Sequence, residues 1–266
     1  ASIACLGRSP FATRLPSAFV GILTLAATFD LGRTLWNRRA GRWALAVLAV
    51  TLWHIHLSRV SFRSVLLPFF MALYLAQGAR ALRSGKWRFW LAAGVFYGAS
   101  WYTYMAARFT PIALAVLALH GLLCYPQKMR LHWRGAVLAA LAALIVLLPL
   151  GLYTLRSPEV VLARSGQVSV FSEEIHGGQP WRTLLRHTIA TAGMFTVQGD
   201  RIWRHNLALR PVWEPALGVA FLWGLGIALA RLRRDPSAAL AVLWTAVMAL
   251  PTLLAEDAPH FLRGVG

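Results

Sequence analysis

The sequence predicts an all-α fold, a bundle of helices that crosses a membrane several times, and three observations support this prediction. Hydrophobic residues make up 58% of the chain and charged residues only 14%, whereas a soluble domain carries about 25% charged residues. Apolar runs close to the length of a membrane span recur along the chain. The segments between these runs are rich in arginine, as are loops that flank membrane helices.

A membrane-spanning helix needs about 20 mainly apolar residues, and about eight segments approach that length. The predicted spans are 15–35, 43–58, 64–82, 88–104, 108–125, 135–155, 215–231 and 238–255. Pro16 and Pro215 lie where helices are predicted to begin, a position that tolerates the missing N–H. Pro149 and Pro251 lie inside spans and are predicted to kink them.

The arginine-rich connectors predict the orientation of the spans. Four alternate connectors carry most of the basic residues: 33–42, 80–88, 125–134 and 231–236. By the positive-inside rule these four are cytoplasmic. The opposite set is then external: 1–14, 59–63, 105–107, 156–214 and 256–266. The net charge of +18 therefore reflects topology, and we expect no nucleic-acid partner.

Three regions follow from these spans. Residues 1–155 hold six predicted membrane helices with short loops, and 215–266 hold two more and the start of a further external segment. The connector 156–214 is too long for a simple turn and contains a predicted amphipathic helix near 181–195. Seven of the nine acids and six of the eight histidines fall on or near the external face. Acid–base or metal chemistry needs that mixture, so we expect the site there.

The first candidate site residues lie at external helix ends. Arg59 and Arg63 are four positions apart, so on a helix they would share a face and form a phosphate clamp. The alternative is that both arginines extend to lipid headgroups, which leaves His54 unexplained. Tyr104 and Arg108 lie on either side of the external connector 105–107 and are further candidates, although tyrosines at this level also form interfacial belts.

Two further segments combine acids with imidazoles. The segment 197–206, VQGDRIWRHN, places Asp200 near His205 and beside an aromatic ring that suits a sugar. The segment 256–263, EDAPHFLR, holds Glu256, Asp257, His260 and Arg263. These groups are candidates for contact with a sugar or a divalent metal ion. The alternatives are mutual ion pairs in the first segment and a helix cap in the second, with Arg263 paired across a turn.

Five segments carry a resemblance to a known family: RLPSAFVGILTL (14–25), WHIHLSRVSFRSVLLP (53–68), YGASWYTYMAARFTP (97–111), RSGQVSVF (164–171) and EDAPHFLR (256–263). In this order they resemble bacterial glycosyltransferase family 39. This is the dolichyl-phosphate-mannose protein mannosyltransferase-like group, which is related to lipid A aminoarabinose transferase. The resemblance implies a GT-C membrane fold in the bacterial plasma membrane. It also implies transfer of a sugar from a polyprenyl-phosphate carrier to an acceptor outside the cytoplasm.

The resemblance further implies that the catalytic acid lies in the first external loop, which the matching segments place upstream of Ala1. We therefore expect this sequence to lack one N-terminal span and the part after residue 266, and no catalytic residue is assigned. Within the sequence, we expect His54, Arg59, Arg63, Tyr104 and Arg108 to bind the lipid phosphate. Sugar or metal contacts are expected from Asp200, His205, Glu256, Asp257, His260 and Arg263. A flippase for lipid-linked saccharides and a non-catalytic membrane subunit remain alternatives.

Overall fold

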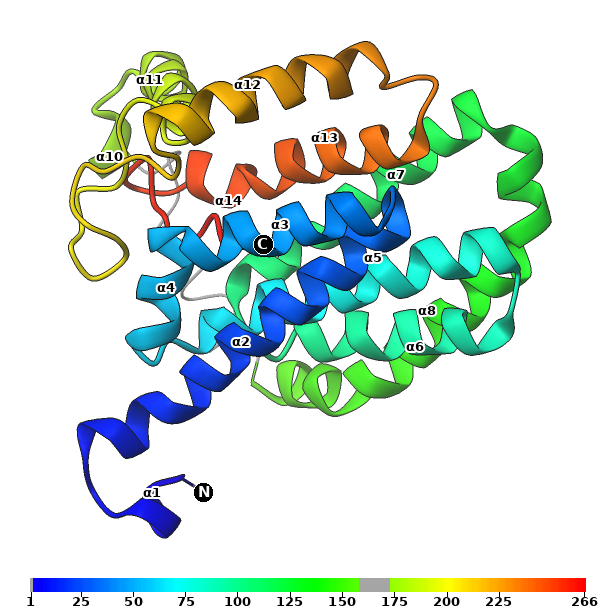
Figure 1. Cartoon of the computed structure of the whole chain (residues 1–266), viewed down its shortest axis with the longest axis horizontal. Helices are drawn as coiled ribbons and strands as arrows, with labels where there is room; N and C mark the ends of the chain where they lie inside the picture. Colours follow the sequence, from blue (N-terminus) through cyan, green and yellow to red (C-terminus); the bar gives the residue numbers. More distant parts are fainter. Residues whose placement is uncertain (1, 158–172) are drawn as a thin grey trace. The chain divides into compact units, whose positions relative to one another are not determined.

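The computed structural model describes residues 2–157 and 173–266 of the chain, and every regular element among them is a helix (Figure 1). The segment 164–171, which contributed to the predicted family resemblance, lies outside the described residues. The chain divides into two compact units. The first consists of Ala1–Ala107, Gly121–Leu147 and Val265–Gly266, and the second of Arg108–His120 and Leu148–Gly264.

The helices follow the predicted order along the chain. They are α1 (Ser2–Leu6), α2 (Pro10–Leu35), α3 (Arg38–Val50), α4 (Leu52–Arg59), η1 (Arg63–Val65), α5 (Leu66–Ser84), α6 (Trp87–Ser100), η2 (Met105–Phe109), α7 (Thr110–Cys124), α8 (Pro126–Arg156), α10 (Glu173–His176), α11 (Pro180–Gly193), α12 (Pro215–Ala230), α13 (Pro236–Met248) and α14 (Leu250–Leu253). Helices α5 and α6 pack side by side, as do α12 and α13 (Figure 1).

The prediction of an all-α membrane bundle is confirmed. Five helical segments of the described chain are long and apolar enough to cross a membrane: Pro10–Leu35, Arg63–Ser84, Met105–Cys124, Pro126–Arg156 and Pro236–Leu253. Helix α12 is apolar but shorter. The predicted span 88–104 is helical only as α6, which has 14 residues. The total of eight spans therefore stays a prediction.

The predicted span 43–58 is not one helix. It is divided at Thr51, whose ψ of 113° takes the backbone out of the helical region between α3 and α4. The Thr51 hydroxyl donates to the Val47 carbonyl at 2.7 Å, so part of the hydrogen bonding at the end of α3 comes from a side chain. The histidines and Arg59 at the predicted external end consequently lie on the short, separate helix α4.

Polar side chains define several helix ends. The Ser9 hydroxyl accepts from the Ala12 N–H at 3.1 Å, so α2 begins at Pro10 and the prediction that a helix begins near Pro16 is wrong. Pro215 does occupy the first turn of α12. Pro149 lies inside α8. Helix α13 ends at Met248, and Pro251 lies in the first turn of α14.

Small residues let α6 approach α8 closely within the first unit. A Cβ atom on Gly94 would lie 2.2 Å from the Ala139 carbonyl oxygen, and one on Gly98 would lie 2.8 Å from Val146 Cβ. A Cβ on Gly135 would lie 2.2 Å from the Trp90 indole nitrogen. Glycines four residues apart that bring two helix backbones together are a common device of membrane helix packing.

An ionic contact ties α2 to α5. Asp30 Oδ1 lies 2.7 Å from an Arg33 guanidinium nitrogen and 2.5 Å from Arg80 Nη2. Arg83 donates to the carbonyl oxygens of Thr34 and Leu35 at the end of α2. These bonds satisfy carbonyls that have no partner within the helix and place positive charge at its negative end.

Candidate functional site

The segment that carries Asp200 is held in a closed loop by its own backbone. The Gly199 N–H donates to the Leu209 carbonyl at 3.1 Å, and the Leu209 N–H donates to the Asp200 carbonyl at 2.7 Å. At the start of this loop, the Asp200 carboxylate accepts from the Ile202 N–H at 2.8 Å. The result is a compact connection between α11 and α12 in which Asp200 and His205 are each only 1% exposed.

Close backbone approach explains the glycine before Asp200. A Cβ atom at Gly199 would lie 1.9 Å from the Arg210 carbonyl oxygen and 2.7 Å from Phe261 Cζ. Real Cβ atoms do not approach neighbours this closely. A residue larger than glycine would therefore force the loop and Phe261 apart. Because His260 lies next to Phe261 in the chain, the loop would also move away from His260.

The C-terminal segment reaches the loop through its backbone. The Phe261 N–H donates to Asp200 Oδ2 at 3.0 Å, and the Phe261 side chain is fully buried. One residue earlier, the His260 N–H donates to the Thr252 hydroxyl at 2.6 Å. Two successive backbone bonds therefore fix where the His260 imidazole lies.

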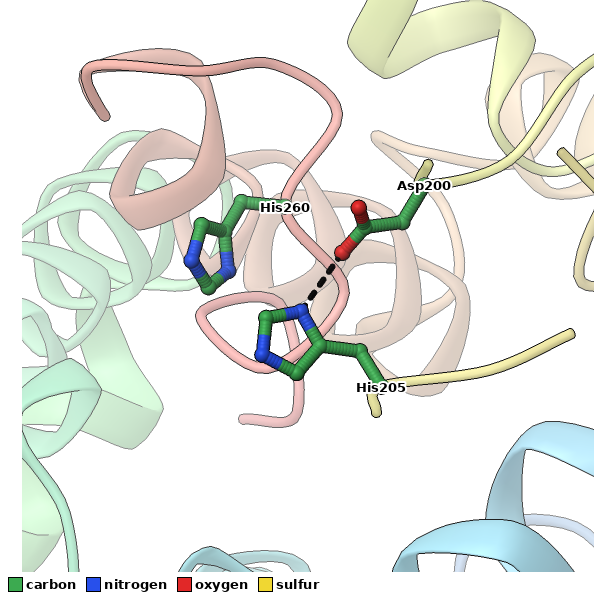
Figure 2. Close-up of side chains that lie close together, drawn as sticks. All are labelled: Asp200, His205 and His260. Atoms are coloured by element: carbon green, nitrogen blue, oxygen red, sulfur yellow. Dashed lines mark hydrogen bonds and ion pairs between the residues drawn. The ribbon is translucent and has the colours of Figure 1, made fainter. Parts of the chain in front are cut away.

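Asp200, His205 and His260 form one buried cluster (Figure 2). His205 Nδ1 lies 2.7 Å from Asp200 Oδ2, and the two imidazole centroids are 4.6 Å apart. One potential ligand atom from each residue lies within 4.8 Å of the others. The group offers a carboxylate and two imidazoles, which is a donor set that can hold a divalent metal ion.

The surroundings shift the pKa values of two members. Burial raises the pKa of the Asp200 carboxyl, but hydrogen bonds from His205 and from the backbone of Ile202 and Phe261 outweigh it and leave that pKa below its usual value. Burial, followed by the charges of Arg263 and His205, lowers the pKa of His260 to about 4. At neutral pH the carboxyl is therefore ionised and the His260 imidazole is uncharged.

Of the candidate residues in the segment 256–263, only His260 belongs to the cluster. Glu256 and Asp257 are exposed and contribute no ligand atom to the group of three. Arg263 lies 3.6 Å from Glu256, as the alternative interpretation of that segment expected. His260 instead joins Asp200 and His205, which come from a different predicted candidate segment.

Arg59 lies beside a hollow in the first unit. The hollow has a volume of about 210 Å³ and is lined by Arg14, Leu52, Ile55, His56, Arg59 and Val60. Its basic members come from α2 and α4. The sequence did not single out Arg14. Its position at the predicted external end of a span, level with Arg59, is the feature that identifies it.

The remaining predicted phosphate ligands lie elsewhere. His54 Nε2 is 3.2 Å from the Gly21 carbonyl, so this ring packs against α2. Arg63 begins η1 and is exposed, and it is not among the residues that line the hollow. Tyr104 is partly buried just before η2. Arg108 is exposed in η2 and belongs to the second unit.

The apolar helices and the arginine-bearing helix ends define an integral membrane protein. The chain belongs to the family described as dolichyl-phosphate-mannose-protein mannosyltransferase, whose model matches residues 1–153. This family consists of GT-C membrane glycosyltransferases, so the class of the protein is membrane glycosyltransferase. No curated protein and no solved structure matches the chain. The matched residues include Arg14, Arg59 and Arg108, whereas the cluster around Asp200 follows them in the chain.

Proposed function

We propose that the protein transfers a sugar from a polyprenyl-phosphate-linked donor to an acceptor on the extracytoplasmic face of the bacterial plasma membrane. The family match over residues 1–153 supports transfer of a glycosyl group. The description of the family refers to dolichyl-phosphate mannose, a sugar carried on a lipid phosphate, and a polyprenyl phosphate is the corresponding class of donor. The predicted topology puts most of the acids and histidines, and the hollow beside Arg59, on the same, external side.

The hollow beside Arg59 is the observation that carries this proposal. Arg14 and Arg59 both line one small concavity, and His56 lines it as well. Guanidiniums bind phosphate oxygens through short, charge-assisted hydrogen bonds. The apolar side chains of Leu52, Ile55 and Val60 complete the lining and suit the hydrocarbon next to a lipid phosphate. Arg63, Arg108, His54 and Tyr104 remain proposed contributors to phosphate binding.

The reaction requires stabilisation of the leaving group. An acceptor hydroxyl or amine attacks the anomeric carbon while the bond from that carbon to the phosphate oxygen breaks. The electron pair of this bond stays on the polyprenyl phosphate, and the acceptor proton passes to a base that we do not assign. Fixed guanidiniums beside the phosphate stabilise the negative charge that develops there. Asp200, His205, Glu256, Asp257, His260 and Arg263 are the proposed contacts for the sugar or a divalent metal ion.

The test replaces the arginines near the predicted phosphate site in the natural protein. Arg59→Gln combined with Arg63→Gln should lower turnover of a polyprenyl-phosphate sugar by roughly ten- to a hundredfold, since each lost donor removes stabilisation of the leaving phosphate. Turnover is measured by release of polyprenyl phosphate from radiolabelled donor.

A matched control carries Arg39→Gln with Arg42→Gln. These arginines are also exposed, but they lie on α3 at the predicted cytoplasmic side. Equal turnover in both double variants and the parent protein, at equal expression, would remove Arg59 and Arg63 from the site. Movement of the donor across the membrane without sugar transfer would instead identify a flippase.

A further inference from the structure

Two segments that are distant in the sequence supply the buried cluster of Asp200, His205 and His260. The first is the closed loop 199–209 between α11 and α12, and the second is the segment that follows α14. We propose that the three side chains bind a divalent cation of the zinc class, and that this cation fastens the segment 254–264 to the closed loop. The inference builds on the metal contact of the proposed function, but it assigns the cation a structural role that does not depend on sugar transfer.

Asp200 orients the first imidazole. Its carboxylate can only accept hydrogen bonds, so His205 Nδ1, at 2.7 Å, must be the donor. A cation bound between Asp200 Oδ2 and His205 Nδ1 takes the place of this proton, and the neutral ring then carries its hydrogen on Nε2 instead.

His260 supplies the second imidazole. Its Nδ1 is enclosed and has no hydrogen-bond partner among the described residues. An enclosed polar atom without a partner has lost its water without compensation. A bond from this nitrogen to a cation would restore the lost interaction, and the hydrogen bonds of the His260 and Phe261 N–H groups already hold the backbone that carries the ring.

The donor set favours zinc over the harder cations. Calcium and magnesium prefer sites built mainly from oxygen ligands, whereas two imidazoles with one carboxylate are typical of zinc. Zinc–nitrogen bonds of about 2.0–2.1 Å bring tetrahedral ligands to roughly 3.4 Å from one another. The ligand atoms here lie within 4.8 Å, so rotations of the side chains suffice to close the site.

One nearby charge opposes a cation. Arg263 acts electrostatically on His260, and its guanidinium lies 3.6 Å from Glu256. The Glu256 carboxylate therefore offsets part of the positive charge beside the cluster. The Asp200 carboxylate brings a negative charge of its own, which offsets one of the two positive charges of a divalent ion in this buried site.

The first measurement counts zinc in the natural protein, purified in detergent without donor or acceptor, stripped with a chelator and reloaded with zinc. We expect about one tightly held zinc ion per chain, because the described residues offer one such group of ligands. His205→Ala and His260→Ala should each lower zinc affinity at least tenfold, whereas the control His176→Ala should leave it unchanged. The control histidine lies in α10, and its Nδ1 accepts from the Gly178 N–H. Equal zinc binding by all four proteins, or by none, would overturn the proposal.

The second measurement uses the unaltered protein and does not depend on how the variants fold. Hydrogen exchange is compared for the chelated and zinc-loaded protein. Zinc should slow exchange of amides in 199–209 and 254–264 and leave those of α6 unchanged. If zinc binds but the amides of these two segments exchange as fast in the zinc-loaded protein as in the chelated protein, the structural role is wrong. Sugar transfer is assayed separately, so loss of transfer in the arginine variants and absence of zinc binding are distinguishable results.

Discussion

At the scale of single residues, Gly199 shows how a backbone position controls the geometry of a site. Its hydrogen atom faces the Arg210 carbonyl oxygen and the ring of Phe261 at distances that exclude a methyl group. The neighbouring residue, Asp200, accepts a hydrogen bond from the Phe261 N–H. The place of His260 in the cluster therefore depends on the absence of a side chain at position 199.

Gly199→Ala should destabilise the protein by about 1–3 kcal/mol, because the loop must move to make room for the added carbon. The free energy of unfolding is measured in detergent by denaturant titration. The control is Gly224→Ala in α12, where an added Cβ meets no atom within 4 Å. That change should be neutral or stabilise the helix by up to about 1 kcal/mol. Equal effects of the two substitutions would contradict the close approach at Gly199.

The residues of the cluster were only partly predictable from the sequence. Each of the three was a candidate because acids and imidazoles gathered on the predicted external face. Their grouping was not predictable, since Glu256 and Asp257 are nearer to His260 in the chain than Asp200 is. The backbone bond from Phe261 to Asp200 selects the partner, and such a tertiary contact leaves no pattern in a single sequence. Arg14 was missed because it lies on α2 and Arg59 on α4, so the two arginines are distant in the sequence.

At the scale of elements, the contact between α6 and α8 depends on two glycines one turn apart. Gly94 faces the Ala139 carbonyl and Gly98 faces Val146. In a lipid environment, helices gain little from burying apolar surface against each other, so close packing of backbones supplies much of the association energy. A branched side chain on this face would force the two helices apart.

Gly94→Val should therefore destabilise the first unit by about 1–3 kcal/mol or more, as overpacking does elsewhere. Gly78→Val is the matched control, because Gly78 also lies in an apolar helix and a Cβ there would meet no atom within 4 Å. Unfolding is followed by loss of helical circular dichroism as sodium dodecyl sulfate is added. A similar midpoint for both variants would show that the glycine face does not set the helix spacing.

The boundaries of the helices were predicted less well than the presence of the helices. The long apolar runs at α2, α5 and α8 were predicted within a few residues to either side, except that α2 and α8 extend further at their N-termini. The break at Thr51 was missed, because threonine is compatible with an apolar run and its effect depends on a side-chain bond to Val47. Hydropathy detects the composition of a span and does not detect a turn of the backbone within it.

At the scale of the whole molecule, composition and the spacing of apolar runs were sufficient for the class of fold. Few charged residues and repeated spans leave a membrane bundle as the predicted architecture, and the helical structure agrees. The side of the membrane on which each connector lies depends on a different property, the asymmetry of arginine between alternate connectors.

Cysteine labelling tests this orientation. In a background in which Cys5 and Cys124 are replaced by serine, Ser84→Cys should resist a membrane-impermeant maleimide on intact cells, and Gln179→Cys should react. Both positions are exposed, so a difference in labelling reports sidedness. Permeabilised cells provide the control, in which both cysteines should react. Labelling of position 84 in intact cells would invert the assignment and move the hollow beside Arg59 to the cytoplasmic side.

The contact between Asp30 and both Arg33 and Arg80 constrains how this protein can change over evolutionary time. Loss of the carboxylate alone would leave the two guanidiniums close together without the negative charge that now lies between them. Replacement of Arg80 alone would leave Asp30 paired with Arg33, its neighbour on α2. Position 80 can therefore vary before position 30 does, and homologues without an acid at 30 should already have a neutral residue at 80.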